Sequence, residues 1–81
     1  MANTYNGWKN YNTWNIALWI QNDEALYNEA LNHVRQDGAD YTKFAMKLRD
    51  HYGMMRTLDG VAYLGDDLDT EALNEMLAEL A

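Results

Sequence analysis

The stretch that decides the fold is Tyr11-Asn12-Thr13-Trp14-Asn15-Ile16-Ala17-Leu18-Trp19-Ile20, residues 11–20. It holds two of the three tryptophans of the chain and no charged side chain. Its apolar residues fall on every side of a 3.6-residue helical repeat, and a helix that is apolar all round must be covered from several directions. The sequence therefore predicts a central helix near residues 13–21, in which Trp14 and Trp19 are both largely buried.

Three further segments have the i, i+3, i+4, i+7 apolar spacing of a helix with one buried face. They lie near residues 23–36, 41–52 and 69–80. The sequence therefore predicts an all-α fold, a small bundle of about four short helices. The apolar positions are Tyr27, Ala30, Leu31 and Val34 in the first of these segments, Tyr41, Phe44, Ala45, Leu48 and Tyr52 in the second, and Leu73, Met76, Leu77 and Leu80 in the third.

Short polar residues and glycines mark where the predicted helices begin and end. A side chain of Asn, Asp or Thr before a helix can accept a hydrogen bond from an otherwise unpaired amide of the first turn. A glycine just beyond the last turn can adopt the left-handed conformation that ends many helices. The sequence indicates Asn12 or Thr13, Asn22 and Asp40 as the caps that start the first three helices, and Gly38 and Gly53 as the ends of the second and third.

At 81 residues the chain is predicted to form a single helical domain over residues 1–81, with an aromatic arm at residues 1–11. A Tyr-Asn-x-Trp pattern occurs at residues 5–8 and again at residues 11–14. Folding of this arm over the core is favoured over a stacking platform for single-stranded nucleic acid, because such platforms lie in positively charged grooves. Residues 61–64, between two glycines, are predicted as an ordered connection or a short extended segment.

No catalytic constellation emerges from the residues. The chain has neither Ser nor Cys, so acyl transfer through those two nucleophiles is excluded. Gly60 and Gly65 have the spacing of a phosphate-binding loop, but Asp66 and Asp67 stand where Lys and Ser or Thr are needed and would repel a phosphate. The sequence therefore predicts a protein that is not an enzyme and that has no cofactor.

Two groups of residues resemble sets of metal ligands. Acidic side chains alternate over residues 67–71 like the first ligands of a helix-loop-helix calcium site, but the sixth and twelfth positions of that loop are alanines. Glu29, His33 and Asp37 stand at four-residue steps, yet a clear fourth ligand is missing and a solvated polar face is favoured. We therefore predict no metal site.

The negative charge is concentrated at the end of the chain. The net charge is −7, and residues 59–81 carry seven acids and no base, whereas residues 23–58 carry six acids and five bases. Nucleic acids and anionic lipids need Lys and Arg near their phosphates, so this distribution argues against direct binding of either one. A partner with a basic surface is compatible with it.

The expected location is intracellular. No apolar stretch approaches the ~20 residues of a membrane span, and the start lacks the basic flank and apolar run of a secretion signal. The absence of Cys fits a reducing cytoplasm. We therefore expect a soluble intracellular protein.

Two segments carry a resemblance to a known family. Residues 11–27 contain Tyr-x-Thr-Trp-Asn, then Leu-Trp-Ile and Asn-Asp-Glu-x-Leu-Tyr, and residues 68–76 resemble the closing helix of the same family. The chain resembles a family of small uncharacterised proteins found largely in bacteriophages and archaeal viruses. The resemblance implies a viral setting and transfers no catalytic residue. The matching motif positions are Tyr11, Thr13, Trp14, Asn15, Leu18, Trp19, Ile20, Asn22, Asp23, Glu24, Leu26 and Tyr27.

Asn15 is the one residue of that motif that helix packing does not require. A polar side chain among tryptophans needs a hydrogen-bond partner if it is buried. A neighbouring backbone group is favoured as that partner over a second protein.

Together these observations favour a non-enzymatic viral accessory protein, located in the host cytoplasm, that binds and modulates a host macromolecule through an acidic surface, as a DNA mimic or an anti-defence inhibitor. The expected partner is a host protein with a basic surface. The alternative is a small virion-associated or assembly subunit, which would form a homo-oligomer through the same surface. A solvated acidic surface without a partner explains the charge at least as well. The predicted partner-binding residues are Asp66, Asp67, Glu71, Glu75 and Glu79.

Overall fold

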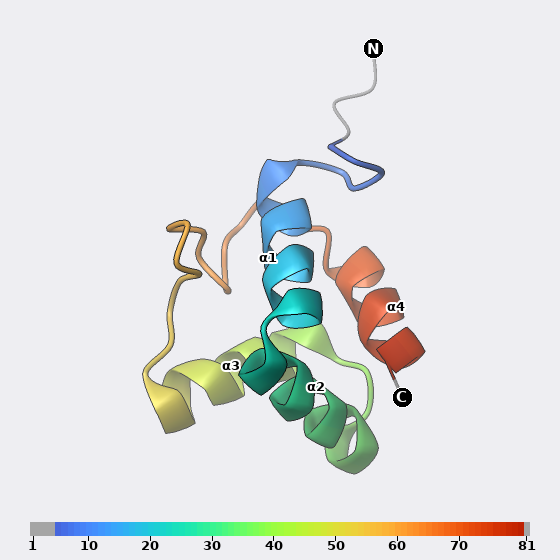
Figure 1. The fold of residues 1–81 in the computed structure, drawn as a ribbon, viewed down its shortest axis with the longest axis vertical. Coiled ribbons are helices and arrows are strands. Elements are labelled where there is room, and N and C mark those ends of the chain that lie inside the picture. The colour runs from blue at the N-terminus through green and yellow to red at the C-terminus, as the bar shows by residue number, and fades with distance from the viewer. Residues whose placement is uncertain (1–4, 81) are drawn as a thin grey trace.

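The protein is described by a computed structural model that covers residues 5–80. Four α-helices follow one another in this range: α1 (Tyr11–Asn22), α2 (Glu24–Asp37), α3 (Tyr41–Tyr52) and α4 (Thr70–Leu80). Helix α1 lies in the middle, with α4 beside it and α2 and α3 below it in the view of Figure 1. The all-α fold predicted from the sequence is confirmed, and over residues 5–80 the only β pairing consists of two isolated bridges.

Helix α1 begins earlier than expected because Asn10 is its N-cap. The Asn10 backbone is extended, and its side-chain oxygen accepts hydrogen bonds from the Thr13 amide at 2.9 Å and the Thr13 hydroxyl at 2.7 Å. The prediction of Asn12 or Thr13 as the cap is therefore wrong. Asn12 donates to the Asp67 carboxylate instead, and the Thr13 hydroxyl accepts from the Asp69 amide, so both residues connect α1 to the start of α4.

The break between α1 and α2 lies at Asp23. Its carboxylate accepts a hydrogen bond from the Leu26 amide at 3.0 Å, and its own amide donates to the Trp19 carbonyl at 2.9 Å. Asp23 thus ends one helix and caps the next, so the expectation that Asn22 caps α2 is wrong. Asn22 is the last residue of α1, and its side chain bonds back to the Leu18 carbonyl.

Helix α3 has the ends that the sequence predicted. The Asp40 carboxylate accepts from the Lys43 amide at 3.1 Å. At the other end, Gly53 adopts φ 66° in the left-handed region and its amide bonds to carbonyls of the last turn. Gly38 ends α2 as predicted, with its amide bonded to the Val34 carbonyl at 3.0 Å, but its φ of 89° and ψ of 176° differ from the left-handed helical conformation expected there. These three positions are specified by local backbone chemistry, which is why the sequence pattern identified them.

The core is built from one face of each helix and from the connection between α3 and α4. Helix α1 contributes Ile16, Ala17 and Ile20, whereas Trp14 and Trp19 are only partly buried. The expectation that both tryptophans are largely buried is met only in part, since Trp19 packs against the edge of the core and neither tryptophan is fully buried within it. Trp14 instead packs against the rings of Tyr5 and Tyr11, with centroid distances of 4.7 and 5.5 Å.

The connection over residues 53–69 is ordered by backbone pairing. Arg56 and Ala62 form an isolated antiparallel bridge, and the Thr57 amide donates to the Val61 carbonyl at 2.8 Å. Val61 and Tyr63 are buried in the core, and the Tyr63 carbonyl accepts from the Tyr41 hydroxyl at 2.6 Å. The short extended segment expected at residues 61–64 is thus limited to one bridge within an ordered connection.

Asn15 holds this connection against α1. Its side chain is 1% exposed; its amide nitrogen donates to the Asp59 carboxylate at 2.8 Å and its oxygen accepts from the Thr57 hydroxyl at 2.8 Å. The Trp19 indole donates to the same Asp59 oxygen at 2.9 Å. The expected backbone partner of Asn15 is therefore wrong, since its closest partners are side chains more than forty residues away in the sequence.

None of the helices in the described range combines the length and the apolar character that crossing a bilayer requires.

Candidate functional site

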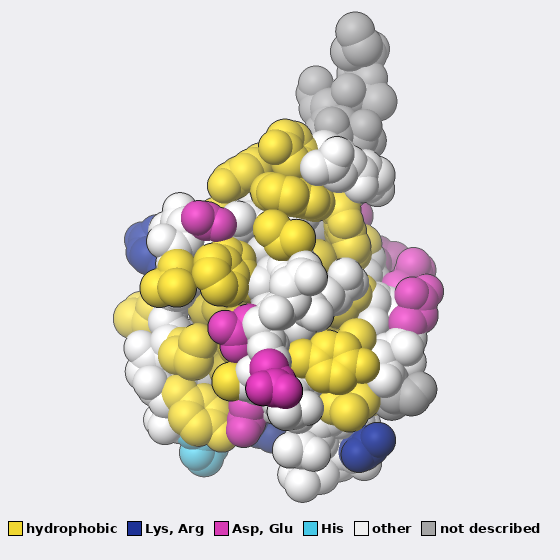
Figure 2. Space-filling model, in the orientation of Figure 1, with side chains coloured by type: hydrophobic (Ala, Val, Ile, Leu, Met, Phe, Trp, Pro, Cys, Tyr) yellow, Lys and Arg dark blue, Asp and Glu magenta, His cyan; other side chains and the backbone are white. Residues whose placement is uncertain are grey.

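The outer face of α4 carries a row of three carboxylates. Glu71, Glu75 and Glu79 are exposed at four-residue steps, opposite the core-facing side chains of the helix. Acidic side chains gather at this edge of the molecule in Figure 2. The ion pairs found among residues 5–80 involve the acids Asp37 and Asp50, so no base neutralises the row. We call these three glutamates the acidic row.

Asp66 and Asp67 lie before α4 rather than on it. The helix begins at Thr70, and Asp69 caps it by accepting a hydrogen bond from the Ala72 amide at 3.1 Å. The acidic row therefore begins at Glu71, because Asp66 and Asp67 precede the helix. The Asp67 carboxylate instead accepts a hydrogen bond from the Asn12 side chain of α1 at 2.7 Å. The Asp67 carbonyl accepts one at 2.6 Å from the side chain of Asn10, the cap of α1.

A recess lies between the acidic row and the N-terminal turn. Its volume is about 240 Å³, and Trp8, Met76, Glu75 and Glu79 are among its lining residues. Tyr5 and Trp8 close the turn with two reciprocal backbone hydrogen bonds of 2.7 and 2.8 Å. This turn packs Trp8 against the core, as expected for an arm folded over it, although residues 1–4 of the predicted arm lie outside the described range. The recess places an aromatic ring beside two carboxylates.

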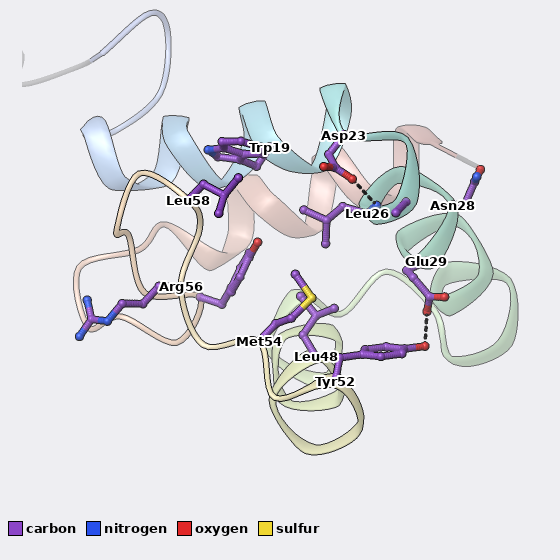
Figure 3. A pocket seen from close by; sticks show the side chains of 12 residues that line it. Trp19, Asp23, Leu26, Asn28, Glu29, Leu48, Tyr52, Met54, Arg56 and Leu58 are labelled. Atoms are coloured by element: carbon purple, nitrogen blue, oxygen red, sulfur yellow. Dashed lines mark hydrogen bonds between the residues drawn. The ribbon is translucent and has the colours of Figure 1, made fainter.

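A larger apolar groove lies between α2, α3 and the connection that follows α3. Its volume is about 560 Å³. Figure 3 shows its walls, with Trp19 and Leu58 along one side and the Tyr52 hydroxyl bonded to the Glu29 carboxylate on the other, at 2.8 Å. That hydrogen bond raises the pKa of Tyr52. The apolar side chains that line the groove include Trp19, Leu26, Leu48, Met54, Leu58 and Tyr63.

This groove could not be predicted from the sequence. Its walls come from segments that are distant in the sequence, so no local pattern specifies it. One signal was present, since Leu58 is an apolar residue next to Asp59 and Gly60 in a turn, and its side chain is 89% exposed. A single exposed apolar side chain is normal on a protein surface, so Leu58 indicates an interaction surface only together with the apolar groove that it borders.

His33 lies in a different environment from the one expected. It is 1% exposed, and both ring nitrogens lack a hydrogen-bond partner within the described part of the chain. Burial lowers its pKa, with the Lys47 charge acting in the same direction. The prediction of a solvated face for Glu29, His33 and Asp37 is therefore wrong for the histidine, which packs against Phe44. Residues 5–80 contain no cluster of three or more side chains suited to hold a metal ion.

These two surfaces have different chemistry. Exposed carboxylates accept hydrogen bonds and attract Lys and Arg, while the apolar groove can bury hydrophobic side chains.

A family of unknown function, DUF7249, matches residues 1–81. No curated protein and no solved structure gives a significant match to the chain.

Proposed function

We propose that this chain, which belongs to the DUF7249 family of unknown function, is a non-enzymatic viral accessory protein that binds a host protein with a basic surface in the host cytoplasm. The binding surface is the acidic row, Glu71, Glu75 and Glu79, with Asp66 and Asp67 nearby. This charge favours one mode of action. As a DNA mimic, the chain would occupy the nucleic-acid-binding surface of a host defence protein and so inhibit it.

The observation that carries the proposal is the unpaired acidic row itself. Like charges at i, i+4 destabilise a helix by roughly 0.2–0.5 kcal/mol per pair, and Glu79 lies at the negative end of the helix dipole. Lys at one of these positions would stabilise the helix, so folding does not explain the pattern. Binding does explain it, because a row of carboxylates attracts a basic surface and speeds its association.

The recess beside the row supports the same function. A Lys or Arg side chain placed there would contact the Glu75 and Glu79 carboxylates and lie near the Trp8 ring. An aromatic face attracts a cation by about 0.5–1 kcal/mol at exposed sites, in addition to the charge attraction. The recess would therefore bind an exposed basic side chain of a protein more strongly than small cations from the solution.

The proposal is tested by recovering the partner from the host. The tagged chain and its Glu75→Lys/Glu79→Lys variant serve as baits in host lysate, and mass spectrometry identifies what each retains. The matched control is Asp37→Lys/Asp50→Lys, which makes the same change in net charge on exposed positions of α2 and α3. Because it also breaks the ion pairs with Lys47 and Arg49, circular dichroism first establishes that this control folds. We expect a basic protein to be retained by the wild type and the control and lost with the variant. Equal recovery by all three baits would show that the acidic row does not bind the partner.

A further inference from the structure

We propose that the apolar groove binds the hydrophobic face of a basic amphipathic helix supplied by the partner. The inference rests on the proposed function for the basic character of that partner, and it adds the element that the partner inserts. Its basis is the shape, the exposed apolar rim and the charges of the groove.

The groove has the size and lining of a binding site. Its volume of about 560 Å³ lies within the roughly 300–1,000 Å³ that is usual for ligand sites, and its lining is predominantly apolar. Two rim residues are strongly exposed, Leu58 at 89% and Tyr52 at 52%. Exposed apolar side chains that border an apolar hollow mark an interaction surface. An amphipathic helix fills such a groove with residues at i, i+3, i+4 and i+7.

The walls of the groove are held in place before any partner arrives. The Asp59 carboxylate accepts from Trp19 and Asn15, which fixes the turn that carries Leu58 against α1. Across the groove, Tyr52 is held by its hydrogen bond to Glu29. A site whose walls are already positioned loses less conformational entropy when it binds.

The charges around the groove favour a basic occupant. Asp23 and Glu29 line it, whereas its one basic residue, Arg56, donates a hydrogen bond to the Gly60 carbonyl at 3.1 Å. A second copy of the chain, also with net charge −7, would bring like charge toward this surface. A helix with Lys or Arg beside its apolar face has the complementary charge, so a basic partner helix is favoured over self-association.

The three tryptophans allow a direct test by nuclear magnetic resonance. Trp19 lines the groove, Trp8 lies in the acidic recess, and Trp14 lies in the cluster with Tyr5 and Tyr11. The indole N–H of each gives its own signal in nitrogen-15-labelled protein. Two synthetic peptides with the same helical Leu face are added, one with Lys and the other with Glu on the polar face. We expect the Lys peptide to shift the Trp19 signal to saturation and the Glu peptide to bind at least about tenfold more weakly.

Substitution of Leu58 provides the second arm. Leu58→Glu removes an apolar contact from the rim and should weaken the Lys peptide about tenfold, while its high exposure leaves the melting curve unchanged. Leu64→Glu is the matched control, because Leu64 is also an exposed leucine of this connection but does not line the groove. An unshifted Trp19 signal, equal binding of the two peptides, or equal affinity of Leu58→Glu and wild type would overturn the inference. A Trp19 shift that follows protein concentration without peptide would assign the groove to a second copy instead and would equally overturn it.

The outcomes separate this inference from the proposed function. If Glu75→Lys/Glu79→Lys abolishes partner capture while the Lys peptide leaves Trp19 unshifted, the acidic row binds and the groove does not. If the peptide shifts Trp19 but capture survives charge reversal, the groove stands and the role of the acidic row is wrong.

Discussion

Asn15 and Asp59, 44 residues apart in the sequence, are joined by a hydrogen bond of 2.8 Å between the Asn15 amide nitrogen and an Asp59 carboxylate oxygen. The same Asn15 side chain accepts from the Thr57 hydroxyl. This buried asparagine therefore fixes the connection after α3 against α1, and with it the wall of the groove that carries Leu58.

We expect Asn15→Ala to lower the free energy of unfolding by about 1–3 kcal/mol, because the Thr57 hydroxyl loses its acceptor and Asp59 loses a donor. Urea unfolding followed by circular dichroism measures the change. Asn22→Ala is the control, since Asn22 is exposed and its side chain bonds, within residues 5–80, to the carbonyl of Leu18 in its own helix. Equal effects of the two substitutions would contradict the role given to Asn15.

Ile16 should matter more to stability than Trp14, although Trp14 is larger. Ile16 is 0% exposed in the core, whereas Trp14 is partly exposed in an aromatic cluster. We expect Ile16→Ala to lower the free energy of unfolding by about 2–5 kcal/mol and Trp14→Ala to lower it by less. Chemical denaturation of the two variants measures which substitution costs more. A larger loss for Trp14→Ala than for Ile16→Ala would contradict the prediction.

Stability should fall as the pH drops below the usual histidine pKa of 6.5, because of His33. Its folded-state pKa is lowered, so the unfolded chain takes up a proton first and acid favours unfolding until the folded-state pKa is also passed. Burial is the main cause of the lowered His33 pKa and the Lys47 charge adds to it, whereas Asp37 and Asp40 oppose the shift. Thermal melts between pH 7 and about pH 5 should show the loss.

His33→Phe should remove most of that pH dependence, since Phe has no proton to gain, and it also removes the 3.6 Å contact between His33 Nδ1 and the Asp37 carboxylate. His51→Phe is the control, because His51 is exposed. His51→Phe should keep the pH dependence of the wild type. If His33→Phe keeps it as well, the titration of His33 does not cause the loss of stability in acid. The carboxylate of Asp59 titrates in a separate range, because hydrogen bonds from Asn15 and Trp19 lower its pKa below its usual value of 3.8.

Charge reversal on α4 should not destabilise the free protein. Glu75→Lys/Glu79→Lys replaces like-charge neighbours with opposite charges and places Lys near the C-terminal end of the helix, where the dipole favours a cation. We expect the free energy of unfolding to stay equal or to rise by a few tenths of a kcal/mol per relieved pair. A clear loss of stability in urea would mean that the glutamates serve the fold.

Features encoded locally could be predicted from the sequence. The Asp40 cap and the Gly53 end depend on backbone groups within one helical turn, and the apolar stripe of α4 depends on spacing alone. The start of α1 was missed because Asn10, Asn12 and Thr13 can all act as caps, and the choice depends on contacts with Asp67 and Asp69 across the fold.

Burial and long-range pairing could not be predicted in the same way. The apolar pattern of residues 11–20 showed that α1 is central but not which of its sides the other helices leave open, so the burial of Trp14 and Trp19 was overestimated. The acidic row could be predicted from the four-residue spacing of its glutamates in the sequence. The groove beside Trp19 was not, because α2, α3 and the connection form it only after folding.

The most direct test of the central claim is the association rate constant between this chain and the basic host protein that it captures, measured at several salt concentrations. We expect the rate constant for the wild type to fall steeply with added salt, and that for Glu75→Lys/Glu79→Lys to be lower and nearly independent of salt. The Asp37→Lys/Asp50→Lys control should stay closer to the wild type. If the variant with the reversed acidic row associates as fast as the wild type and with the same salt dependence, the claim that the acidic row binds the partner is wrong.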